Sequence, residues 1–146
     1  MAYSGRFSPK NPNKYLGDPM NIIYRSLWER RVMVHLDENP GVVKWSSEEI
    51  VIPYLSPVDN RWHRYFPDFY VQTMNKNGML ESRVLEIKPK SQAVAPKAKK
   101  RVTKQYIQEV MTYGINEAKW KAATEYCKDR NWKFVVLTED DIFGTT

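Results

Sequence analysis

The sequence predicts an α/β fold, a mixed β-sheet flanked by helices in the order α-β-β-β-α-β. Three observations support this fold class. Apolar residues recur at helical spacing after Pro19, two runs rich in β-formers flank the turn signal of residues 75–78, and a short β-branched run follows helical segments near the C-terminus. Elements in this order indicate helices packed on a mixed sheet.

Length and composition fit one domain. The chain has 146 residues, of which 42% are hydrophobic and 27% charged, as in soluble globular proteins. It contains no run of about 18 apolar residues and no signal-peptide pattern, so we expect no membrane association. The single cysteine, Cys127, excludes an internal disulfide and fits a reducing cytosol. We expect a single domain over residues 18–146, preceded by an extended basic arm over 1–17 that could become ordered against a partner.

The net charge of +6 is unevenly distributed along the chain. Residues 1–17 contain no acid, and neither do residues 87–108. The second segment carries most of the candidate phosphate contacts: Lys90, Lys97, Lys99, Lys100, Arg101 and Lys104. Each segment alone could be a solvated face. Together they favour a polyanionic partner.

The first helix is predicted from Asp18, as N-cap, to the Pro40–Gly41 breaker. Residues 42–56 are expected to form one or two extended pieces, and 61–73 and 81–89 to form strands around a hairpin turn. After a loop over 90–97, the pattern fits either two helices or one helix interrupted near Gly114. Residues 132–142 are predicted to be a closing, buried strand.

The register of the predicted hairpin decides whether two carboxylates, Asp68 and Glu86, face each other. If Lys76–Gly78 is a three-residue loop, paired positions sum to 154 and Asp68 lies opposite Glu86, roughly 5 Å away at Cβ. Other loop lengths, or a bulge at Pro67, would shift the register. Strand alternation puts Lys88 on the same face as Glu86.

Such a group fits two interpretations. Adjacent carboxylates repel each other, and a hard divalent cation such as Mg²⁺ or Mn²⁺ removes that repulsion. The alternative is an ordinary cross-strand patch of ion pairs, because the triplet Glu-x-Lys is common.

The sequence Pro67-Asp68, followed by Glu86-Ile87-Lys88 across a hairpin, resembles the PD-(D/E)xK nuclease superfamily, whose fold is restriction-endonuclease-like. The preceding stretch "YRSLWERR" is similar to the N-terminal nuclease domain of the endonuclease subunit of multi-component bacterial transposons. The resemblance implies a Mg²⁺ (or Mn²⁺) held by Asp68, Glu86 and the Ile87 carbonyl, with Lys88 acting on the attacking water and Glu29 as a further acid. Glu29 could instead be an exposed acid paired with Arg25 or Arg30.

Across its whole length, including "MAYSGRF" and "NKYLGDP", the chain resembles the small head-completion proteins of T-even-type tailed phages. That resemblance implies a role after DNA packaging, in the host cytoplasm or on the virion, with portal, neck or other head-completion proteins as partners. The function expected is metal-dependent DNA cleavage. The alternative is a non-catalytic head-completion or DNA-binding factor that retains the nuclease fold.

Three polar residues are lesser candidates for the site: His63, Glu49 and Gln105. His63 would face away from Asp68 unless a bulge intervenes, and Glu49 precedes an extended run that could border the site. Related nucleases use Gln or Tyr near the phosphates, which draws attention to Gln105. No base-reading motif is visible, so we expect little sequence preference.

Overall fold

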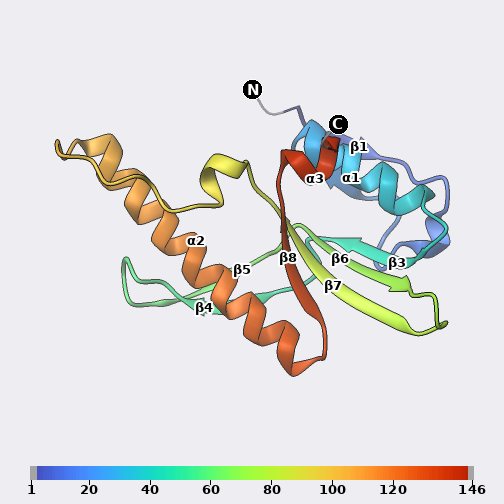
Figure 1. The fold of residues 1–146 in the computed structure, drawn as a ribbon. Coiled ribbons are helices and arrows are strands. Elements are labelled where there is room, and N and C mark those ends of the chain that lie inside the picture. The colour runs from blue at the N-terminus through green and yellow to red at the C-terminus, as the bar shows by residue number, and fades with distance from the viewer. Residues whose placement is uncertain (1–2, 145–146) are drawn as a thin grey trace.

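The computed structural model describes residues 3–144 and centres on a mixed four-stranded sheet (Figure 1). Its strand order is β3 (Val42–Ser47), β6 (Phe69–Met74), β7 (Leu80–Ile87) and β8 (Lys133–Leu137). The first three strands are antiparallel neighbours, and β8 runs parallel to β7. The predicted mixed sheet with flanking helices is therefore confirmed.

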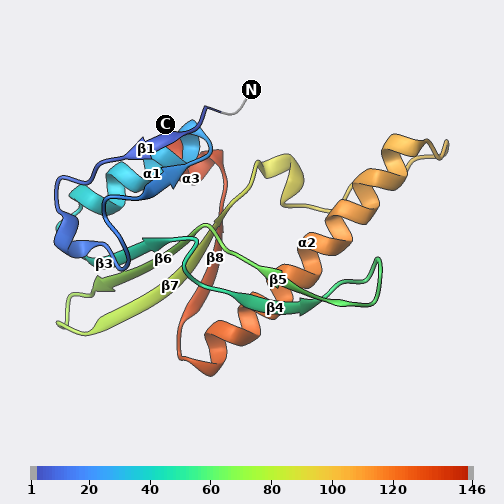
Figure 2. The ribbon, with the colours of Figure 1, turned by 180° about the vertical axis from the view of Figure 1, so that it is seen from behind.

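Strand alternation gives the sheet two apolar faces, each covered by a helix. Phe69, Val71 and Leu85 pack in the cluster that includes α1 (Leu27–Glu38). Tyr70 and Val84 point the other way and pack with Cys127 of α2 (Lys104–Asp129). The two helices consequently lie on opposite faces, as Figures 1 and 2 show from front and back. No helix in the described part of the chain is long and apolar enough to cross a membrane.

Helix α1 begins eight residues later than predicted. Its N-cap is Ser26, whose hydroxyl accepts the Glu29 N–H at 3.1 Å, whereas the Asp18 side chain only closes a local turn with the Met20 N–H. Residues 22–24 form a strand instead of helix, because β2 (Ile22–Tyr24) pairs with β1 (Gly5–Phe7). A serine with Glu three residues on is a stronger start signal than Asp before Pro.

The expectation of an extended N-terminal arm is wrong for the described residues. Phe7 and Tyr15 are buried against Trp45, and η1 (Pro12–Lys14) lies between them. The buried Asp37 carboxylate accepts the backbone N–H groups of Lys10 and Asn11 at 2.8 and 3.0 Å. The buried aromatic rings and the Asp37 carboxylate hold this segment against the domain. The predicted boundary at residue 18 therefore does not separate an arm from the domain.

The hairpin between β6 and β7 has the predicted register. Phe69 pairs with Leu85 and Met74 with Leu80, so that paired positions sum to 154. The loop is Lys76–Gly78, closed by a hydrogen bond from the Asn75 N–H to the Met79 carbonyl at 2.8 Å. Gly78 has φ of 75°, a left-handed value that the three-residue hairpin requires.

The predicted strand over 61–73 is two strands. β5 (Trp62–Tyr65) pairs with β4 (Ile52–Leu55) in a separate two-stranded sheet, and β6 starts at Phe69. Between them lies the buried Pro67, which has no N–H to donate to a ladder. The chain therefore changes sheets immediately before Asp68.

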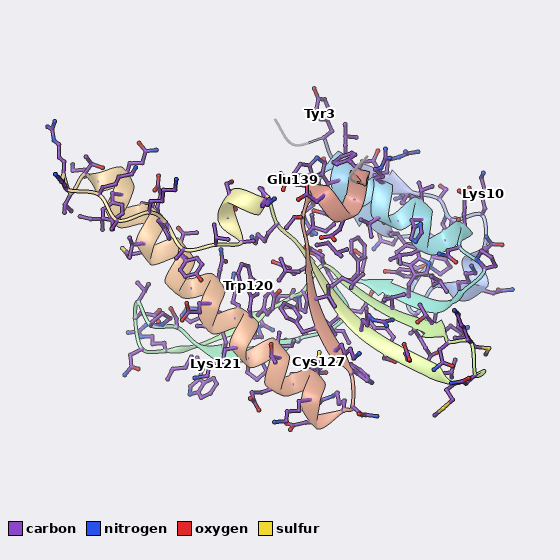
Figure 3. All side chains as sticks on the ribbon, viewed as in Figure 1. Tyr3, Lys10, Trp120, Lys121, Cys127 and Glu139 are labelled. Carbon is purple, nitrogen blue, oxygen red and sulfur yellow. The ribbon has the colours of Figure 1, made fainter. Side chains whose placement is uncertain are left out.

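Residues 104–129 form one continuous helix, not two helices. Its C-terminal half packs on the sheet through Ala123 and Cys127, while its N-terminal half extends beyond the sheet (Figures 1 and 2). In Figure 3, Trp120 and Cys127 lie along the part of the helix that crosses the sheet. The short η2 (Lys90–Gln92) and α3 (Glu139–Phe143) were not predicted, and α3 takes the end of the region predicted to be strand.

Replacing Asp37 tests how the N-terminal segment is held. Asp37→Ala should lower the free energy of unfolding by about 2–4 kcal/mol, because two backbone donors lose a charged acceptor. Urea unfolding measures this. Glu38→Ala, which removes only the exposed pair with Lys10, is the matched control and should change stability little. Equal stability of the two variants would contradict the account.

Candidate active site

Asp68 and Glu86 lie at the point where β6 begins and β7 ends. The register that pairs Phe69 with Leu85 makes these two residues the next opposing pair. The Ile87 N–H donates to Asp68 Oδ2 at 2.7 Å, which orients the carboxylate toward the end of β7. The predicted juxtaposition of the two acids is therefore present.

Burial works against ionisation of both carboxylates. Burial and the neighbouring Glu86 charge raise the pKa of Asp68 to about 8, although the Ile87 N–H partly counteracts them. Burial also raises the pKa of Glu86, with Lys88 acting in the opposite direction. Glu86 is only 6% exposed, so water screens this repulsion weakly. The pair is costly to keep ionised unless a cation lies beside it.

Lys88 lies on the same side of β7 as Glu86, as strand alternation predicts. Its Nζ is 3.8 Å from Glu86 Oε2, and the side chain is half-buried. The Lys88 N–H donates to the Leu137 carbonyl at 2.9 Å, so its backbone is held by the neighbouring strand. The ammonium is consequently fixed at the edge of the carboxylate pair.

Glu29 is close to the pair but engaged locally. Its carboxylate accepts the Arg25 N–H at 3.1 Å and lies 3.5 Å from the Ser26 hydroxyl. Burial, followed by the charges of Asp68 and Glu48, raises the pKa of Glu29 against the opposing effect of the Arg25 N–H. Within residues 3–144, no three His, Cys, Asp or Glu side chains converge closely enough to share one ion. Direct ligation by Glu29 beside Asp68 and Glu86 is therefore not seen and stays a prediction.

Two further residues that the sequence did not indicate line the site. The Tyr65 hydroxyl is buried and has no hydrogen-bond partner among the described residues, while burial and the Glu86 charge raise its pKa. Lys119 of α2 sits over the rings of Tyr54 and Tyr65, with Nζ 5.8 and 5.5 Å from their centroids. Burial and then the Lys88 charge lower the pKa of Lys119, whereas Glu86 opposes them. Lys119 reaches the site because α2 packs against the β4–β5 hairpin, a contact that the sequence does not indicate.

The lesser candidates do not join the pair. His63 is in β5, where its Nε2 lies 2.7 Å from Asp59 Oδ2 and its ring stacks on Tyr54. Glu49 is exposed, and its carboxylate lies beside Gly17. Gln105 lies in the first turn of α2, in the half of the helix that extends beyond the sheet. None of the three contacts Asp68 or Glu86 through a hydrogen bond within residues 3–144.

The predicted phosphate contacts separate into two groups. Lys90 is engaged by α3, because its N–H and ammonium contact Glu139 and Asp140 at 2.7 and 3.1 Å. Figure 3 places Glu139 at the start of α3, away from the extended half of α2. The other group is exposed around the tip of that half: Lys97, Lys99, Lys100, Arg101 and Lys104. This basic tip is the part of the predicted set that is open to a polyanion.

The donor set fits a hard divalent cation. Asp68 and Glu86 offer carboxylate oxygens, which Mg²⁺ and Mn²⁺ prefer, and they lie next to a buried hydroxyl without a partner. Two protein carboxylates completed by phosphate oxygens and water are a usual ligand set for Mg²⁺. A structural ion-pair patch accounts less well for two neighbouring acids that are both buried and have raised pKa values.

Comparison with known proteins agrees with this geometry. Residues 39–139 match the family model of the TnsA-like endonuclease N-terminal domain, a span that contains Asp68, Glu86, Lys88 and Lys119 but not Glu29. Over 146 aligned residues the chain is 40% identical to the head completion nuclease of Enterobacteria phage T4, covering 97% of this chain and 95% of that protein. Endonucleases of this family generally use divalent metal ions. The chain belongs to the TnsA-like endonuclease family.

Proposed function

We propose that the protein is a PD-(D/E)xK endonuclease that hydrolyses DNA with Mg²⁺ or Mn²⁺ and acts in phage head completion after DNA packaging. The observation that carries the metal dependence is the Asp68–Glu86 pair, two neighbouring carboxylates at the junction of β6 and β7 whose pKa values are both raised, chiefly by burial. The name of the T4 relative supports the stage of action. The host cell during phage assembly, or the virion itself, would be the place of action.

Asp68, Glu86 and the Ile87 carbonyl would hold the ion. The Ile87 N–H keeps Asp68 turned toward the end of β7, so both carboxylates can ligate without rearrangement of the backbone. The bound ion would lower the pKa of the attacking water and offset negative charge on the phosphate. Glu29, at the start of α1, is a candidate ligand for a second ion.

Lys88 and Lys119 would act on the phosphate side of the site. Lys88, beside Glu86, can hold the attacking water and help to remove its proton. Lys119 forms no ion pair among the described residues and instead rests on two aromatic rings near a second ammonium. An arrangement of two close cations is unfavourable alone and becomes favourable when a phosphodiester lies between them.

The basic tip would hold neighbouring phosphates of the substrate. Each phosphate contact there should add about 0.9 to the slope of log affinity against log salt on duplex DNA. Because these contacts carry no base information, cleavage should show little sequence preference.

The proposed metal site is tested with the purified protein, supercoiled and linear DNA, and Mg²⁺, Mn²⁺ or EDTA. Asp68→Asn and Lys88→Ala should each reduce cleavage by about 10³-fold or more, because each removes several kcal/mol of transition-state stabilisation. DNA binding by gel shift in EDTA should remain. Lys121→Ala, an exposed lysine on α2, is the control and should cleave normally. Unchanged DNA binding with no cleavage by any protein would favour the non-catalytic alternative.

The raised carboxyl pKa values predict how stability without metal depends on pH. Asp68 has a pKa near 8 in the folded protein and near 3.8 when unfolded, so the folded state binds the proton more tightly. Its contribution to stability is complete below about pH 4 and is lost as the pH rises through 8. In EDTA, the Tm of Asp68→Asn minus that of the wild type should therefore increase between pH 5 and 8. A difference that stays constant over this range would exclude a raised Asp68 pKa.

Lys119 should affect the chemical step more than folding. Lys119→Ala is expected to lower kcat by about 10²-fold, as loss of one electrostatic contact to the transition state commonly does. Lys119→Arg should recover part of the rate. Single-turnover cleavage, with circular dichroism as the folding control, measures both. If Lys119→Ala cleaved at the wild-type rate, the second cation would have no part in the reaction.

A further inference from the structure

A groove with a volume of about 600 Å³ runs between the segment after β7 and the extended half of α2. One wall comes from η2 and the following loop: Ser91, Gln92, Val94 and Pro96. The other comes from one side of α2: Gln105, Gln108, Glu109, Thr112, Tyr113 and Asn116. In Figure 1 this is the region where the chain leaving η2 runs back along the helix. Amides, hydroxyls and the Tyr113 ring line it together with Val94 and Pro96, and most of its surface is apolar.

Asn116 lines the groove at the end nearest the sheet. It is only 5% exposed. Its side-chain amide has two donors and an acceptor, a set that can pair with the edge of a nucleobase.

Both walls of the groove lie close in the chain to the two lysines of the active site. Asn116 lies three residues before Lys119 on α2, so the two side chains are neighbours on the helix surface. On the opposite wall, Ser91 follows Lys88 by three residues. A strand whose phosphate lies between Lys88 and Lys119 would therefore have its adjoining nucleotides at the mouth of the groove.

Charge decides which part of a strand faces inward. Glu109 lines the groove and repels phosphate, whereas the rim at the tip of α2 is basic: Lys97, Lys99, Lys100, Arg101 and Lys104. Lys99 Nζ lies 4.0 Å from a Glu109 carboxylate oxygen and above the Tyr106 ring. These contacts connect the basic rim to the α2 wall of the groove. This pattern places phosphates outside and bases inside, the orientation used by proteins that bind single strands.

We propose that the groove binds an unpaired DNA strand adjoining the cleavage site, so that the enzyme prefers duplexes with single-stranded ends. The proposal deepens the function proposed above and rests on it. In paired DNA the base edges face the other strand and cannot reach Asn116 or stack on Tyr113. Unpaired bases can do both.

Binding in EDTA tests the proposal apart from catalysis. The probes are one fluorescein-labelled duplex with blunt ends and the same duplex with a single-stranded tail of about eight nucleotides, at the 3′ or the 5′ end. Wild-type protein should bind one tailed duplex about tenfold more tightly than the blunt one. Tyr113→Ala and Asn116→Leu should each remove most of that preference while leaving blunt-duplex affinity unchanged.

Two controls separate this proposal from the nuclease mechanism. Lys121→Ala and Asp68→Asn should keep the tail preference, since neither lines the groove. Equal affinity of wild-type protein for all three probes, or an unchanged preference in both groove variants, would overturn the groove proposal. Cleavage that persists in Asp68→Asn would overturn the proposed function and leave the tail preference as a separate result.

Discussion

The hydrogen bond from the Ile87 N–H to the Asp68 carboxylate connects the fold to the site. It joins the residue before β6 to the last residue of β7, at the point where the chain has just left the β4–β5 hairpin. The hairpin register alone brings Asp68 opposite Glu86, but this bond fixes the direction of the carboxylate. A slip of one residue would turn Glu86 to the other face and bury an acid against α1.

The two faces of the sheet contribute differently to the site. The α1 face is anchored by Trp45 and by the N-terminal segment held at Asp37, and it brings Glu29 near the acids from one side. The α2 face brings Lys119 from the other side through its packing on Tyr54 and Tyr65. The carboxylates therefore lie between an acid from one helix and a cation from the other, a distribution suited to a metal on one side and a phosphate on the other.

The sequence was sufficient for features that depend on local pattern. The turn around Gly78 determined the register, and alternation along β7 placed Lys88 beside Glu86. It failed where tertiary packing overrides local preference. Residues 22–24 fit a helix pattern, yet pairing with β1 makes them a strand. The polar N-terminal segment looked unstructured because its anchors, Phe7 and Tyr15, are isolated aromatics whose partner Trp45 is distant in sequence. No sequence motif marks Lys119. Its position at the site depends on how α2 packs across the β4–β5 hairpin, which is distant from it in the sequence.

The central claim is that Asp68 and Glu86 together hold a divalent cation. Electron paramagnetic resonance of Mn²⁺ titrated into the protein without DNA measures it most directly, because free and bound Mn²⁺ give different signals. Wild-type protein should bind Mn²⁺ saturably, and binding should be lost in Asp68→Asn and in Glu86→Gln but retained in Glu81→Gln, near the opposite end of β7. Equal Mn²⁺ binding by wild-type protein and the two carboxylate variants would contradict it.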